Sequence, residues 1–257
     1  KIPVVHTEHG SGFVAGTSKL IGVASRLVDL TLGRYVLSAA DRVLGVSEEA
    51  VAFARRLGAK SPAVFYNAIP EVPARSVALD RPGHFVFVGR MVPGKGWDTF
   101  LEAIAQLKRS GHDVTGELLG DGESLQAAKA LVEELGLCGT VEVRGRVEPS
   151  SVRDALRGAT LVNPTVLSEG FQSTLLEALA EGGRVVTYPV PGAELLREQG
   201  APVLITDDKH ADALAAVMER LIAEPPPVVE PSFMEQWTWP TRSKQYLEIL
   251  QEVTGKD

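Results

Sequence analysis

The chain has 257 residues, 44% of them hydrophobic, and its 26 Lys and Arg residues against 33 Asp and Glu residues leave a formal net charge of −7. The length fits one large domain or two modest ones, and the apolar content excludes a disordered chain or a small disulfide-stapled scaffold. The acidic balance excludes a broad positive surface for indiscriminate binding of nucleic acid or anionic membranes, so any phosphate must be bound locally. Cys138 is the single cysteine and cannot form an internal disulfide, which favours a reducing, cytoplasmic setting.

The N-terminal segment, residues 1–72, alternates short β-branched runs with helical spacing. The pattern predicts strands at 2–7, 42–46 and 63–66 and helices at 20–37 and 48–56. Strands that alternate with helices are typical of βαβ units around a parallel sheet. The chain opens inside the first of these strands, without Met or a leader peptide, and we therefore expect the whole protein to start earlier.

Prolines without any periodicity mark the next segment, at Pro70, Pro73 and Pro82. This composition is typical of a linker, which we place at 73–82. The C-terminal unit, 83–224, predicts strands at 84–88, 114–119, 140–143, 160–162, 184–187 and 202–205. Helices are predicted at 98–109, 124–135, 150–157, 172–181, 193–199 and 210–222. The alternation indicates a doubly wound parallel sheet.

Helix ends in this unit carry recognisable signals. Asp98 or Thr99 is placed to cap the 98–109 helix, and Gly182-Gly183 is a left-handed stop for the 172–181 helix. Beyond a triple proline at 225–227, residues 225–257 are predicted to form a crossover segment and a last helix at 241–253. The apolar side of that helix must cover another part of the molecule.

The loop after strand 84–88 is the first candidate site, because ligands of open parallel sheets bind at the carboxyl ends of the strands. It carries Gly89, Arg90 and Lys95. Arg offers a fork of donors and Lys a compact charge, which suits a local phosphate clamp. Two solvated surface cations would give the same pattern.

The second candidate is the turn into the 172–181 helix. Its backbone N–H groups can meet a diphosphate at Gly170, Phe171, Gln172 and Ser173, with Ser173 or Thr174 as the cap. Glu169 and Glu177 lie at the same end, and carboxylates suit sugar and ribose hydroxyls as acceptors. The alternative is that Glu169 complements the helix dipole and Glu177 is a solvated helix acid.

Weaker signals surround these two loops. Gly120 begins a turn between a strand and a helix, which is a candidate part of the site, but an ordinary tight turn would have the same sequence. The backbone of Arg144, Gly145, Arg146 and Val147 follows another strand and can line a base-binding slot. His6, Glu8 and His9 follow the first strand, but their spacing is not the helical i, i+4 pair of a zinc hydrolase, and we predict no metal site. A hydrogen-bonded histidine and a substrate-facing polar cluster both remain open. Ser47 and Asn67 also end strands, where turn and cap roles are expected.

Three ordered segments resemble known motifs. They are 87–96 (FVGRMVPGKG), 119–122 (LGDG) and 168–180 (SEGFQSTLLEALA). Together they resemble the retaining glycosyltransferases of the GT-B fold, family 4 (glycosyl transferases group 1), with the E-x7-E signature in the third. Residues 42–47 and 66–69 are similar to the later part of that family's N-terminal domain. The resemblance implies an α/β fold of two Rossmann-like, doubly wound parallel-sheet domains, of which the N-terminal one is incomplete.

The resemblance also implies an activity. A sugar would pass from a UDP- or GDP-linked donor to the hydroxyl of a sugar, lipid or small molecule, with retention and without a metal or other cofactor. Arg90 and Lys95 would neutralise the leaving diphosphate, Glu177 would bind the ribose, and Glu169 and His6 would face the transferred sugar. No nucleic-acid partner is implied, and a missing N-terminal segment would make any peripheral contact with the inner face of the membrane.

Two positions depart from the family, since Gln172 and Ala68 stand where Gly is common. Three other functions remain open at this stage. The chain can be a nucleotide-sugar-binding fragment without turnover, an epimerase or phosphorylase of the same architecture, or an NAD enzyme. The last would require a G-x-G-x-x-G run after the first strand of a domain, and neither unit has one.

Overall fold

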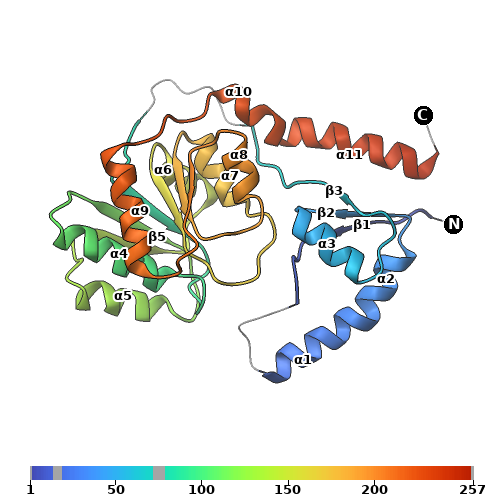
Figure 1. Cartoon of the computed structure of the whole chain (residues 1–257), viewed down its shortest axis with the longest axis horizontal. Coiled ribbons are helices and arrows are strands. Elements are labelled where there is room, and N and C mark those ends of the chain that lie inside the picture. The colour runs from blue at the N-terminus through green and yellow to red at the C-terminus, as the bar shows by residue number, and fades with distance from the viewer. Residues whose placement is uncertain (1, 14–18, 72–78, 256–257) are drawn as a thin grey trace.

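The computed structural model describes residues 2–13, 19–71 and 79–255 and contains two parallel β-sheets (Figure 1). The larger sheet has the strand order β6-β5-β4-β7-β8-β9. Its strands are β4 (His84–Val88), β5 (Thr115–Leu119), β6 (Val141–Gly145), β7 (Thr160–Asn163), β8 (Arg184–Thr187) and β9 (Val203–Ile205). The order reverses between β4 and β7, so the topological switch point lies there. The predicted doubly wound sheet is confirmed.

Helices cover both faces of this sheet (Figure 1). One face packs against α4 (Trp97–Arg109), α5 (Leu125–Glu134) and α9 (Ala211–Ala223), and the other against α6 (Pro149–Leu156), α7 (Ser173–Ala180) and α8 (Ala193–Glu198). Strand β4 shows why both faces are apolar. Phe85 and Phe87 enter the first core, and Val86 enters the second, because successive side chains of a strand point to opposite faces.

The smaller sheet has the order β1-β2-β3, with β1 (Val5–Glu8), β2 (Arg42–Gly45) and β3 (Ala63–Val64). Helix α3 (Glu48–Arg56) packs on it through Phe53, in a small core with Leu37 and Val43. Ser47 accepts a hydrogen bond from the backbone N–H of Ala50 at 3.1 Å, so the predicted cap role of Ser47 is confirmed.

The helix expected at 20–37 is interrupted. It consists of α1 (Lys19–Val28), a π-helical turn η1 (Asp29–Gly33) and α2 (Arg34–Ala39). The apolar face of α1 is turned outward, since Leu20 is 83% exposed and Val23 is 70% exposed. Arg26 of the same helix lies over the ring of Phe13, 4.7 Å from its centroid.

The C-terminal segment returns to the first half of the chain. After α10 (Pro231–Met234) and the 3₁₀ turn η2 (Glu235–Trp237), the last helix α11 runs from Trp239–Thr254, two residues earlier than predicted. Ile69 donates its N–H to the carbonyl of Trp237 and accepts from Trp239, both at 2.9 Å. Tyr246 packs on Phe65 with ring centroids 5.5 Å apart, although no side chain of α11 is fully buried.

Two predicted caps are wrong. Helix α4 begins after Gly96, whose φ is +85°, with no side-chain cap, and α7 begins after Gln172 without a cap from Ser173 or Thr174. Asp98 instead accepts from the N–H of the next residue. The left-handed stop after α7 is confirmed at Gly182, with φ +68°.

The predicted linker falls mainly outside the described residues, which resume at Leu79. The side chain of Asp80 accepts from Arg184 at 2.6 Å, so this end of the segment is fixed to the larger sheet. None of the helices in the described ranges has both the length and the apolar content needed to cross a bilayer.

Candidate functional site

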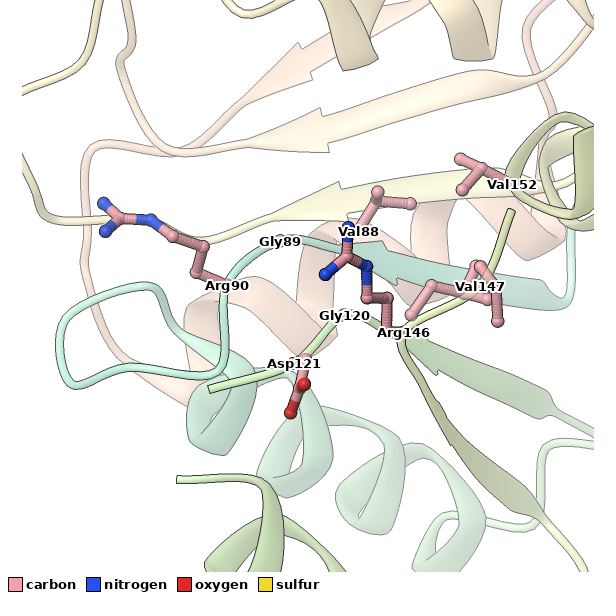
Figure 2. Close-up of a pocket in the computed structure, with 9 residues that line it drawn as sticks. Val88, Gly89, Arg90, Gly120, Asp121, Arg146, Val147 and Val152 are labelled. Carbon is pink, nitrogen blue, oxygen red and sulfur yellow. The ribbon is translucent and has the colours of Figure 1, made fainter. Parts of the chain in front are cut away.

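A pocket of about 340 Å³ opens at the carboxyl ends of β4 and β5 (Figure 2). It is lined by Val88, Gly89, Arg90, Leu119, Gly120, Asp121, Arg146, Val147 and Val152. Gly120 has φ +145°, and a Cβ there would clash with the carbonyl oxygen of Gly89. Because only glycine permits this approach of two backbones, the chain segments that follow β4 and β5 can lie against each other where they line the pocket. Five residues that the sequence analysis assigned to separate candidate features, Gly89, Arg90, Gly120, Arg146 and Val147, thus line one cavity.

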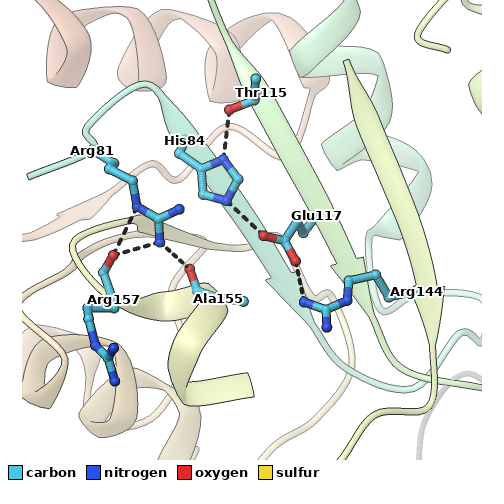
Figure 3. A network of polar contacts seen from close by, with 7 residues as sticks. All are labelled: Arg81, His84, Thr115, Glu117, Arg144, Ala155 and Arg157. Carbon is cyan, nitrogen blue, oxygen red and sulfur yellow. Dashed lines mark hydrogen bonds and ion pairs between the residues drawn. The ribbon is translucent and has the colours of Figure 1, made fainter. Parts of the chain in front are cut away.

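Arg144 does not line this pocket, in contrast to the predicted base-binding slot. Its Nη1 donates to Oε2 of Glu117 at 2.7 Å, and the other oxygen of Glu117 pairs with His84 at 3.1 Å (Figure 3). Burial disfavours the charge on Glu117, but the hydrogen bonds from Arg144 and His84 outweigh burial and lower the pKa of the carboxyl. Gly145 contributes through its backbone, since its carbonyl accepts from the N–H of Gly120.

Lys95 and Glu169 form an ion pair, with Nζ and Oε1 2.5 Å apart. The two side chains are only 13% and 19% exposed, so water screens the pair weakly. The lysine loop is fixed by Gly96, because a Cβ there would clash with the backbone of Pro164. Two charges that the sequence assigned to different parts of a ligand are therefore direct partners here.

Arg90 is exposed at the rim of the pocket, and its guanidinium extends away from Arg146 in Figure 2. Among the described residues no carboxylate lies within ion-pair distance of it. Its positive charge is thus available to an anion that enters from solvent.

Glu177 lies on the first turns of α7 and is half-buried. Burial raises the pKa of its carboxyl, and this effect is partly offset by a hydrogen bond from Ser173 and by the charge of Arg153. A fully solvated helix acid would show no such shift, so that alternative is disfavoured. The carboxylate sits one helical turn beyond the N–H groups that α7 leaves without intrahelical acceptors.

Gln172 adopts an extended backbone with φ −81°, so the position does not require the glycine common in the family. Its Oε1 accepts from Asn163 at 2.6 Å, and Asn163 also donates to Thr187 at 3.1 Å. The side chain is thereby held against the ends of β7 and β8.

The first half of the chain reaches the turn before α7, residues 168–171, which we call the signature loop. Ser11 donates to the carbonyl of Glu169 at 2.5 Å, and Asn67 donates to the carbonyl of Phe171 at 2.7 Å. Sequence reasoning assigned no site role to Ser11. The polar run that follows β1 was the available signal.

The two histidines of this region lie in different places. His6 is inside β1 and faces Glu8, with 3.8 Å between Nε2 and Oε2. His9 follows the strand, and its carbonyl oxygen lies so close to Gly170 that a Cβ on that glycine would clash with it. The described residues contain no group of three or more His, Cys, Asp or Glu side chains able to hold a metal ion.

A second pocket, of about 470 Å³, lies between the two halves of the chain, and residues 168 and 169 of the signature loop line it. It is lined by Ser11, Glu49, Leu167, Ser168, Glu169, Pro189, Val190, Pro191, Glu194, Arg197, Ile205 and Asp207. Residues from both halves thus surround Glu169.

Known proteins show the same architecture. The chain superposes on Anabaena Alr3699/HepE, solved in complex with UDP-glucose, with a TM-score of 0.77, 20% identity and coverage of 97% of this chain and 72% of that one. Sucrose-phosphate synthase from Thermosynechococcus elongatus gives a TM-score of 0.77, 20% identity and coverage of 98% and 68%. These likenesses confirm the GT-B fold.

Sequence relatives agree. The D-inositol 3-phosphate glycosyltransferase of Nocardia farcinica is 28% identical over 85% of this chain and 54% of its own length. The enzyme of that name from Rhodococcus jostii is 26% identical over 98% and 62%. The chain thus spans between about half and three fifths of these relatives. The family model described as glycosyl transferases group 1 matches residues 82–224, more than half of the chain. The protein therefore belongs to the glycosyl transferases group 1 family.

Proposed function

We propose that this chain transfers a sugar from a nucleotide-diphosphate sugar to an acceptor hydroxyl, as a retaining and metal-independent enzyme of family 4. The observation that carries the proposal is that three features lie along the carboxyl edge of the larger sheet. These are the pocket that Gly89 and Gly120 line, the ion pair of Lys95 with Glu169, and the half-buried Glu177. Structural relatives solved with UDP and with UDP-glucose make UDP the first donor nucleotide to test.

The geometry suggests how a donor would lie. Its base fits the pocket beside Arg146 and Val147, and its ribose lies within reach of Glu177, an acceptor of two hydrogen bonds. The diphosphate would then lie between Arg90, Lys95 and the N-terminus of α7, where free N–H groups favour anions.

The chemical step follows from charge. Bond cleavage leaves negative charge on the diphosphate, and Arg90 and Lys95 stabilise it, which replaces a metal ion. When Lys95 turns to the diphosphate, the carboxylate of Glu169 becomes free to accept hydrogen bonds from the sugar. The acceptor hydroxyl attacks the face that the diphosphate leaves and gives its proton to the departing phosphate oxygen, so configuration is retained.

The acceptor side belongs to the first half of the chain. A role for His6 there stays a prediction, and His9 is a second candidate because its backbone touches the signature loop. We take the acceptor to be a sugar, a lipid or a small molecule with a free hydroxyl. A cytoplasmic location, with any membrane contact at the inner face, is part of the proposal and fits the single cysteine.

Thermal unfolding with UDP, GDP and ADP tests donor binding, because a ligand that binds the native state raises the melting temperature. We expect one of the three to raise it, and UDP-glucose incubated with candidate hydroxyl acceptors to yield a retained glycoside. If no nucleotide raises the melting temperature, the proposal is wrong. Nucleotide binding without transfer to any acceptor would instead identify a nucleotide-sugar-binding fragment.

A further inference from the structure

Two hydrogen bonds from the first half of the chain hold the backbone of the signature loop. The hydroxyl of Ser11 donates to the carbonyl of Glu169 at 2.5 Å. The amide of Asn67 donates to the carbonyl of Phe171 at 2.7 Å. The partners are separated by 158 and 104 residues along the chain. These hydrogen bonds therefore exist only while the two halves are closed on each other.

The backbone between these two carbonyls is equally confined. Gly170 lies so close to the carbonyl oxygen of His9 that no side chain fits there. The ring of Phe171 stacks on Trp237 with centroids 5.5 Å apart and an interplanar angle of 16°, and Tyr66 lies 5.5 Å from it on another side. Three consecutive residues of the loop are thus fixed by contacts that lie outside the larger sheet.

Glu169 is consequently held at both of its ends by different halves. Its carboxylate contacts Lys95, in the loop after β4 of the larger sheet, and its carbonyl contacts Ser11, in the loop after β1 of the smaller one. A displacement of this backbone would move the carboxylate, because the carbonyl carbon and the side chain of Glu169 are bonded to the same Cα. The same loop leads into the N-terminus of α7.

We propose that Ser11 and Asn67 are positioning residues that hold the signature loop so that Glu169 faces the donor sugar. The inference rests on the proposed function and adds that the sugar subsite is complete only in the closed molecule. The nucleotide, by contrast, is held mainly by groups that Ser11 and Asn67 do not contact, namely the pocket formed by the loops after β4, β5 and β6, which includes Arg90, and Glu177 within α7. Loss of either positioning residue must then affect the sugar more than the nucleotide.

The first test compares Ser11→Ala with wild type by calorimetry, using UDP and UDP-glucose as separate ligands. We expect about fivefold weaker binding of UDP-glucose, the effect of one neutral hydrogen bond, and unchanged binding of UDP. Ser11→Thr keeps the hydroxyl and should restore the wild-type ratio of the two dissociation constants. Ser243→Ala is the matched control, because that hydroxyl also donates to a backbone carbonyl, Pro240 on α11, at 3.2 Å.

Asn67→Asp is the second variant, since it keeps the shape of the side chain and replaces the donor with an acceptor that repels the carbonyl of Phe171. It should weaken UDP-glucose about tenfold and leave UDP unchanged. An unaltered ratio of the two affinities in both variants would overturn the proposal. Weakening of both ligands together would overturn it too, since that result reports a general structural role.

Hydrogen exchange separates this inference from the proposed function. In the ligand-free protein, Ser11→Ala and Asn67→Asp should speed exchange in peptides that cover 168–173 and leave the helices of the larger sheet unchanged. Unchanged exchange in these peptides would contradict the claim that Ser11 and Asn67 hold the signature loop, whatever the protein binds. If the wild-type protein protects this loop from exchange but binds neither UDP nor UDP-glucose, the proposed function is wrong. The role of Ser11 and Asn67 in orienting Glu169 toward a donor sugar is then wrong as well.

Discussion

The pairing of Lys95 with Glu169 predicts an unusual pair of effects for Glu169→Gln. In the free protein the carboxylate of Glu169 forms an ion pair with Lys95, the residue that we assign to the diphosphate. A diphosphate must therefore replace the carboxylate before it can use that charge. Gln keeps the shape of Glu and removes its charge, so we expect UDP to bind more tightly while sugar transfer becomes slower.

The size of the first effect follows from the geometry of the pair. Nζ and Oε1 are 2.5 Å apart, and both side chains are less than one fifth exposed. A hydrogen bond to a charged group contributes about 1.5–3 kcal/mol. Gln retains a weaker hydrogen bond, so the lower value applies, and it corresponds to about tenfold tighter binding of UDP. The transfer rate should fall about tenfold or more, because the sugar loses a charged acceptor.

Calorimetry with UDP at fixed salt measures the first effect, and product formation from UDP-glucose measures the second. Glu133→Gln is the matched control, since Glu133 is exposed on α5 and its substitution changes the net charge of the chain equally. If Glu169→Gln binds UDP no more tightly than Glu133→Gln does, then the carboxylate of Glu169 does not compete with the diphosphate for Lys95, and the reasoning is wrong.

Three further effects follow from the same structure. Burial raises the pKa of Glu177, so UDP binding should weaken on acidification at a higher pH than an ordinary glutamate with pKa 4.5 would give, and calorimetry on Glu177→Gln should show no such pH dependence. Gly170→Ala should slow transfer about tenfold or more, because its Cβ would clash with the backbone carbonyl of His9 and displace the signature loop; an unchanged rate in the transfer assay would contradict this. Burial lowers the pKa of His84 below 6.5 in the folded protein, so below pH 6.5 the unfolded protein binds more protons at this residue than the folded protein does. The free energy of unfolding should therefore fall as the pH drops below 6.5. Urea titrations should show a flatter dependence for His84→Gln, and lower pH should then expose a second loss as Glu117, whose pKa is also lowered, becomes protonated.

Strands and helices with strong local signals were predictable from the sequence. The apolar run at 84–88 and the run at 184–187 match β4 and β8 at both ends, and the helix predicted at 48–56 begins after its Ser47 cap. The start of α4 was not predictable in this way. Gly96 begins that helix because its loop packs against Pro164, a contact across the sheet that local spacing does not contain.

The sequence predicted which loops line the candidate site, but it did not predict which of their side chains pair with one another. Glycine-rich turns after strands marked the pocket, because parallel strands bring their carboxyl ends to one edge. The direction of the Arg144 side chain was not predictable, because it depends on the register of β6 against β5, which aligns Glu117 with Glu142. That register is set by packing of the two strands and has no signature in either strand alone.

Glu169 shows why the family signature is necessary and yet insufficient for the site. The seven-residue interval places Glu169 before α7 and Glu177 within it, and this much is local geometry. The direction of the Glu169 carboxylate depends in addition on Lys95 and Ser11, which lie 74 and 158 residues away in the chain. Because Ser11 follows β1 of the smaller sheet, the donor-sugar subsite that we propose depends on the contact between the two halves. A substitution that opens the halves should therefore weaken sugar binding even when it lies far from the pocket.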